Sequence, residues 1–194
     1  MLDIERIIQT RIPDIAPVYG GVRGRTISSH KQAYAWKTVV VAGLKQVIDL
    51  RKDYSADRYP ELCHQYGVDY FHYPIDNDRE TIVKMVKLFP TFCEKIDKGG
   101  FYIACAMGRH RTDIAIALYY VMRPSVPFEE VPEMRGHRYM EKKEFRCDDI
   151  AARLNSIIKA VTPDELAMLG LPADYEAEFF RRKKHLFEVN RNFE

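Results

Sequence analysis

The stretch Phe101–Met122 reads FYIACAMGRHRTDIAIALYYVM, and it guides the interpretation of the rest of the chain. Its first four residues, 101–104, are apolar and predict a short buried strand that leads into Cys105. After a short loop, a helix is expected from about Arg111 to Met122. This helix is apolar almost all round from residue 114 onward, so it should lie in the centre of the molecule.

Strands and helices alternate in the sequence that precedes this stretch. The other helices are predicted at 31–42, 61–66 and 80–97, and the other strands at 46–50 and 68–73. Gly43 and Gly67 follow the first two helices, where a left-handed residue commonly ends a helix. The third helix contains Pro90, which should kink it or divide it in two. Its apolar residues lie roughly on one face, namely Ile82, Met85, Val86, Phe89 and Ile96.

This alternation predicts an α/β fold with a central, mostly parallel sheet flanked by helices. Ligand sites in such sheets form at the carboxyl ends of the strands. Two polar stretches follow predicted strands there, IDNDRE at 75–80 and CAMGRHRT at 105–112. We therefore expect these two stretches to meet at one edge of the sheet and to form one site.

Composition excludes several broad classes of protein. The 194 residues are 46% hydrophobic and 30% charged, which is typical of a globular domain. A formal net charge of +2 argues against a generally basic nucleic-acid-binding protein. The longest apolar run, Ile114–Met122, is far shorter than the ~20 residues of a membrane span. Asp3, Glu5 and Arg6 interrupt the N-terminus, so a secretory signal is not expected.

The four cysteines point to a reducing compartment. They form neither a CxxC pair nor a zinc-ligand spacing, and they are Cys63, Cys93, Cys105 and Cys147. A chain with a core of this size does not need disulfides for stability. We therefore expect reduced thiols, a cytoplasmic location, no metal and no cofactor.

The loop between the strand ending at Cys105 and the helix after Arg111 has the features of an anion site. A strand–loop–helix turn directs backbone N–H groups into one concavity, at the positive end of a helix dipole. Gly108 permits the tight curvature. The same field favours the nucleophilic thiolate of Cys105. Arg111 can bind two phosphate oxygens with its planar guanidinium.

Together these residues resemble the signature of the protein tyrosine phosphatase superfamily, Cys-x5-Arg followed by Ser or Thr. The context is most similar to the compact dual-specificity branch and its bacterial relatives, over roughly Pro17–Met122. The stretch GLKQVIDLR at 43–51 resembles an early strand of these proteins. YFHYPIDND at 70–78 resembles their strand and general-acid loop.

The resemblance implies a mechanism in which Cys105 attacks phosphorus and Arg111 stabilises the transition state. It implies that Thr112 assists departure of the thiolate and that no metal takes part. The residues between nucleophile and arginine would bind the substrate phosphate, namely Ala106, Met107, Gly108, Arg109 and His110.

An aspartate would act as general acid. Asp76 is preferred because its spacing to Phe92 resembles that of the family, and Asp78 is the alternative. Asp49 is expected to make structural hydrogen bonds instead. Two positions depart from the family: Ala104 replaces a histidine, which removes one support for the thiolate, and Asp113 replaces a glycine.

The sequence leaves the substrate open. A protein tyrosine or dual-specificity phosphatase acting on phosphorylated proteins is the default that the resemblance implies. Arg109 and His110 suggest a phosphoinositide, an inositol phosphate or another small anionic phosphomonoester instead. Further alternatives are a catalytically silent phosphate-binding module and, ranked third, a sulfur-transfer or arsenate-reducing protein. The oligomeric state is not determined.

Three further features have two interpretations each. Arg23 and Arg25, within PVYGGVRGRTIS at 17–28, either form a lip of the site or lie on an edge strand. Cys63 and Cys93 either pair reversibly with Cys105 or pack as small apolar residues. The run RRKK at 181–184 either contacts a membrane or partner or, as we favour, is a solvated face.

The expected organisation is a single phosphatase domain over residues 1–194. Residues 1–122 form the core that resembles dual-specificity phosphatases. Residues 123–194 begin with a connection broken by three prolines, at 124, 127 and 132, and the remainder is expected to form a charged helical extension of unknown role.

Overall fold

A computed structural model describes residues 1–10, 12, 14–18, 20–27, 33–52, 59–76, 78–108, 110–122 and 159–168. Five strands form one sheet: β1 (Ala16–Val18), β2 (Gly21–Arg25), β3 (Gln46–Asp49), β4 (Asp69–His72) and β5 (Phe101–Cys105). The helices that these residues show are α1 (Ile4–Ile8), α2 (Ala33–Val41), α3 (Tyr59–Gln65), α4 (Arg79–Asp97), α5 (His110–Met122) and α7 (Pro163–Met168).

The sheet has the strand order β1-β2-β5-β3-β4, and every pairing except β1 with β2 is parallel. The predicted central, mostly parallel sheet flanked by helices is therefore confirmed. One alternative for residues 17–28 is corrected: β2 is not an edge strand but lies between β1 and β5. The edge strand on this side of the sheet is the short β1, which contains Pro17, a residue that edge strands tolerate.

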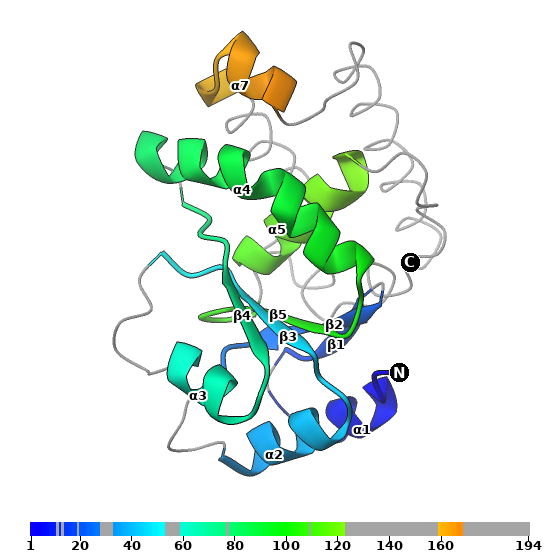
Figure 1. Ribbon diagram of the computed structural model, residues 1–194. Helices are drawn as coiled ribbons and strands as arrows, with labels where there is room; N and C mark the ends of the chain where they lie inside the picture. Colours follow the sequence, from blue (N-terminus) through cyan, green and yellow to red (C-terminus); the bar gives the residue numbers. More distant parts are fainter. Residues whose placement is uncertain are drawn as a thin grey trace, which may run out of the picture.

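Helices cover both faces of the sheet, as Figure 1 shows, with α4 and α5 on one side and α1, α2 and α3 on the other. The residues of β5 alternate between two hydrophobic clusters. Phe101, Ile103 and Cys105 belong to the cluster that contains α4 and α5, while Tyr102 and Ala104 belong to the other. This period-2 alternation buries every residue of β5 from both sides, and the strand leads at its carboxyl end into the loop after Cys105.

The helix α5 confirms the expectation drawn from its apolar sequence. Its residues whose side chains the structure describes beyond position 113 are all buried: Ile114, Ala115, Ile116, Leu118 and Tyr119. Because α5 begins directly after the loop that follows β5, the central helix and the central strand together fix both ends of that loop.

The helix α4 runs unbroken from Arg79 to Asp97 with Pro90 inside it. The predicted division in two at this proline is therefore wrong. The five apolar residues predicted on one face are all buried, and they anchor α4 on the sheet. Gly43 and Gly67, the predicted cap glycines, have positive φ angles of 92° and 64°.

The region after residue 122 is described only over 159–168. Within it, α7 is helical and Val161 packs into the cluster around α4 and α5. The other residues of the predicted extension, including Cys147 and the run at 181–184, lie outside the described residues. Across the described part of the chain, the helices are too short or too polar to traverse a bilayer.

Candidate active site

Cys105 is the last residue of β5, at the carboxyl end of the central strand. It is 3% exposed, and its Sγ accepts a hydrogen bond from the Thr112 hydroxyl over 3.2 Å. Thr112 lies in the first turn of α5 and is fully buried. The nucleophile and hydroxyl predicted from the sequence are thus in direct contact, and the hydroxyl is placed to stabilise a thiolate.

The loop turns back immediately after Cys105. The backbone N–H of Gly108 donates to the carbonyl of Cys105 over 3.1 Å, and Gly108 has a φ of 68°. A Cβ at this position would lie 2.4 Å from the backbone nitrogen of Arg25 and from the carbonyl carbon of Gly24. Glycine is therefore required twice, by the left-handed conformation and by the contact with β2.

The strand β2 forms the wall against which this loop packs. Arg23 is 4% exposed, and its Nη2 donates to the carbonyl of Gly108 over 3.0 Å. The Nη2 of Arg25 donates to Sδ of Met107 over 3.1 Å. Of the two interpretations of these arginines, the structure favours proximity to the site, because both contact the loop between Cys105 and Arg111.

The sequence does not specify the contact of Arg23 with Gly108. Arg23 and Gly108 are 85 residues apart, and their meeting depends on the parallel pairing of β2 with β5. The glycines around Arg23 are the only local signal for such a close approach. A buried guanidinium on the loop carbonyl fixes the orientation of that peptide and adds positive charge near Cys105.

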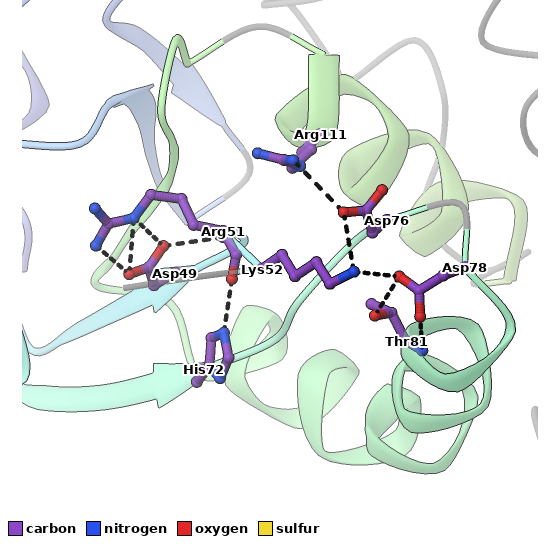
Figure 2. A network of polar contacts seen from close by, with 8 residues as sticks. All are labelled: Asp49, Arg51, Lys52, His72, Asp76, Asp78, Thr81 and Arg111. Carbon is purple, nitrogen blue, oxygen red and sulfur yellow. Dashed lines mark hydrogen bonds and ion pairs between the residues drawn. The ribbon is translucent and has the colours of Figure 1, made fainter. Parts of the chain in front are cut away.

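Arg111, in the first turn of α5, lies 3.9 Å from the carboxylate of Asp76, measured from Nη2 to Oδ2 (Figure 2). Their side chains are 33% and 31% exposed. Asp76 follows β4, and Arg111 follows β5, so the two polar stretches meet at one edge of the sheet as predicted.

Asp78 has a different environment from Asp76. It caps α4, since its carboxylate accepts hydrogen bonds from the Thr81 amide over 2.9 Å and the Thr81 hydroxyl over 2.8 Å. Nζ of Lys52 donates to it over 2.9 Å. The Lys52 ammonium, followed by the amide and hydroxyl of Thr81, holds the pKa of Asp78 well below its usual range. An acid held in the ionised form is a poor proton donor.

Lys52 lies between the two candidate acids in Figure 2. Its Nζ is 2.9 Å from the Asp78 carboxylate and 3.9 Å from that of Asp76. Lys52 follows β3, so three consecutive positions of the sheet edge, after β3, β4 and β5, contribute charged side chains to this network.

Asp49 makes structural hydrogen bonds, as expected. It is fully buried at the end of β3 and accepts from the Arg51 guanidinium over 2.6 Å and from the Tyr70 hydroxyl over 3.0 Å. The guanidinium of Arg51 also lies over the ring of Tyr59. The Asp49 carboxylate is thus engaged within the fold and is not available for the site.

The remaining cysteines of the described region do not approach the site equally. Cys63 is fully buried in the cluster on the opposite face of the sheet from Cys105, and burial raises the pKa of its thiol to about 12. Cys93 is buried in the same cluster as Cys105, and none of these three cysteines forms a disulfide. Packing as small apolar residues fits Cys63, and its pairing with Cys105 is contradicted by their opposite faces.

Several predicted positions lie outside what the structure describes. Arg109 and Asn77 are not described, and for His110 and Asp113 only the helical backbone is. Over the described ranges, no group of three or more His, Cys, Asp or Glu side chains is arranged to hold a metal ion.

No protein-family profile and no curated protein matches this chain. Solved structures similar to it include a DUF442 protein from Shewanella putrefaciens CN-32, with 17% identity over 91% of this chain and 98% of that one, at a TM-score of 0.49. TpbA from P. aeruginosa has 16% identity over 80% and 91% of the two chains, with a TM-score of 0.49. The core catalytic domain of a PP-IP phosphatase from S. cerevisiae has 11% identity over 90% and 96%, with a TM-score of 0.44. Since these TM-scores are below 0.5, the function proposed below rests on this chain's own residues.

Proposed function

We propose that this protein is a phosphatase that hydrolyses phosphomonoesters through a cysteinyl-phosphate intermediate on Cys105. The observation that supports it best is the arrangement at the carboxyl edge of the sheet. A buried cysteine accepts a hydrogen bond from Thr112, and the neighbouring Arg111 faces the carboxylate of Asp76. Nucleophile, phosphate-binding cation and acid are the three groups that this reaction requires.

In the first step, the Cys105 thiolate attacks phosphorus, and the bond between phosphorus and the ester oxygen breaks. Asp76 donates its proton to the departing oxygen. Arg111 and the backbone amides of residues 106–111 would stabilise the charge on the equatorial phosphate oxygens. We assign the acid role to Asp76 rather than Asp78, because Asp78 is held ionised as the cap of α4.

In the second step, water attacks phosphorus and the bond between sulfur and phosphorus breaks. Asp76 accepts the proton from that water, and inorganic phosphate leaves. The Thr112 hydroxyl, 3.2 Å from Sγ, donates to the sulfur as negative charge returns to it. No proton or electron is left over, and no metal is required by the scheme.

The default substrate is a phosphorylated protein, with phosphotyrosine as the first class to test and dual specificity as the wider one. A phosphoinositide or inositol phosphate is the second candidate. It is supported by Arg25, whose guanidinium lies at Met107 beside the loop and supplies a cation additional to Arg111. A substrate with a second anionic group would benefit from that charge.

The test is turnover of an aryl phosphate by the intact protein and by Cys105→Ser. We expect Cys105→Ser to lose on the order of 10³-fold or more of the activity, because the nucleophile is removed. Cys93→Ser is the matched control, since it replaces a buried thiol of the same cluster that is not at the loop. Vanadate should inhibit competitively as a mimic of the pentacovalent phosphate.

Absence of turnover in the intact protein, with vanadate still bound, would identify a silent phosphate-binding module instead. Equal activity in Cys105→Ser and the intact protein would contradict the nucleophile. A panel of phosphopeptides and phosphoinositides, with Cys105→Ser as the blank, then distinguishes the two substrate classes.

A further inference from the structure

The segment 159–168 returns to the beginning of α4 (Figure 1). Arg79, the first residue of α4, donates from its guanidinium to the carbonyl of Ala160 and to both carboxylate oxygens of Glu165, over 3.1 and 3.3 Å. Val161 is 9% exposed and packs into the cluster that contains α4 and α5. The segment thus combines an ion pair in which one guanidinium nitrogen contacts both carboxylate oxygens, a hydrogen bond to a backbone carbonyl, and a buried apolar side chain.

Hydrogen bonds within segment 159–168 orient Glu165 independently of its contact with Arg79. Its Oε2 accepts a hydrogen bond from the Thr162 amide over 2.8 Å, and the Thr162 hydroxyl accepts one from the Glu165 amide over 3.3 Å. The Thr162 amide, with the nearby Arg79 guanidinium, lowers the pKa of Glu165. This reciprocal cap orders the carboxylate at the start of α7, so Arg79 binds a group that is already oriented.

The residue before Arg79 connects this contact to the candidate acid. Asp78 caps α4 and binds Lys52, and Asp76 lies two residues before Asp78. The beginning of α4 is therefore held from two sides, by Lys52 from the end of β3 and by segment 159–168 through Arg79. A shift of this helix end would move the loop that carries Asp76 relative to Arg111.

We infer that segment 159–168 is a positioning element for the acid loop, and we name it the C-terminal clamp. This inference rests on the proposed function of Asp76. An exposed ion pair by itself contributes little to stability. Its effect here is on geometry, since a displacement of about 1 Å in a reacting group costs rate far more than stability. The clamp gives a role to a part of the extension that the sequence left unexplained.

The test compares two substrates that differ in their need for a general acid. Arg79→Met and Glu165→Gln should each reduce kcat for an alkyl phosphate, a poor leaving group, by about fivefold to twentyfold. They should leave kcat for an activated aryl phosphate within about twofold, because its leaving group needs no proton. Glu80→Gln, which makes the same substitution as Glu165→Gln at the exposed residue next to Arg79, is the matched control.

Hydrogen exchange supplies a readout that does not depend on turnover. Amides of residues 75–82 should exchange faster in Arg79→Met and Glu165→Gln than in Glu80→Gln or the intact protein. An equal fall in kcat for both substrates would overturn the proposal that segment 159–168 positions the acid loop. Unchanged hydrogen exchange at residues 75–82 would overturn it as well. If the intact protein turns over neither substrate, the proposed function fails, and the exchange comparison alone still decides whether the clamp orders this loop.

Discussion

The Arg111 guanidinium lies 3.9 Å from the Asp76 carboxylate, although one residue follows β5 and the other follows β4. Two strands of a parallel sheet end at the same edge, which brings their loops together. A phosphate dianion bound at Arg111 would therefore sit beside the carboxyl group that the leaving oxygen needs. This relationship makes Asp76 the central residue of the first prediction.

Asp76→Asn should lower kcat for an alkyl phosphate by roughly 10²-fold or more, because the proton donor is lost. The same substitution should lower kcat for an activated aryl phosphate much less. Asp78→Asn is the matched comparison, and its effect on the alkyl phosphate should be at least about tenfold smaller, because Asp78 is bound to Thr81 and Lys52. A larger effect from Asp78→Asn, measured as kcat against leaving-group pKa, would reverse the assignment.

Thr112→Val should slow the breakdown of the cysteinyl-phosphate. The hydroxyl that donates to Cys105 Sγ would be lost while the buried volume is nearly kept. We expect kcat to fall roughly tenfold, in line with a hydrogen bond to a charged group. Stopped-flow measurement should show a burst of product followed by a slower steady state. Thr112→Ser keeps the hydroxyl and should show no such burst.

Gly108→Ala should disrupt the loop rather than merely weaken the fold. An added Cβ meets the backbone of β2 at 2.4 Å, and the residue has a φ of 68°. We expect a loss of about 2–4 kcal/mol in the free energy of unfolding, together with loss of vanadate binding. Gly67→Ala has a similar φ of 64° with no atom within 4 Å, so it should cost only about 1 kcal/mol and keep binding. Comparable vanadate affinity in both variants would refute the proposed packing.

The Asp78 carboxyl should contribute a pH-dependent part of the stability. Its pKa in the folded chain is lowered, chiefly by Lys52, so the folded state favours the ionised form. The contribution is present above the ordinary carboxyl pKa of about 4 and is lost as pH falls towards the lower folded value. Asp78→Asn keeps a capping side chain but loses the charge. The difference in Tm between the two proteins should therefore shrink between about pH 6 and pH 3; a constant difference would contradict the ion pair.

Residues with a strong local pattern allowed much of the fold to be predicted. The apolar residues of β3 and β5, the glycines at 43 and 67, and the one-sided apolar face of α4 all specify their elements within a few residues. Pro90 was the exception in α4. It removes one hydrogen bond and disfavours the helix locally, but burial of Phe89 and Phe92 on either side outweighs that cost.

Individual roles in the site could be predicted best where its residues are close in sequence. Cys105, Gly108, Arg111 and Thr112 occupy one loop, so their spacing alone indicates an anion site. The choice between Asp76 and Asp78 needed tertiary structure, because it depends on Lys52 and on which residue caps α4. Arg23 could not be assigned for the same reason, as its contact with Gly108 requires the register of two distant strands.

The position of β2 also bears on the order in which the chain folds. β1 and β2 pair as a local hairpin, whereas the contact of Arg23 with Gly108 closes a separation of 85 residues. Contacts between residues so distant in sequence form slowly and late. On the ribosome, a nascent chain that stops before residue 112 can complete the hairpin but not the loop. We therefore expect the environment of Cys105, the proposed nucleophile, to be completed only after the surrounding strands and α5 have been synthesised and folded.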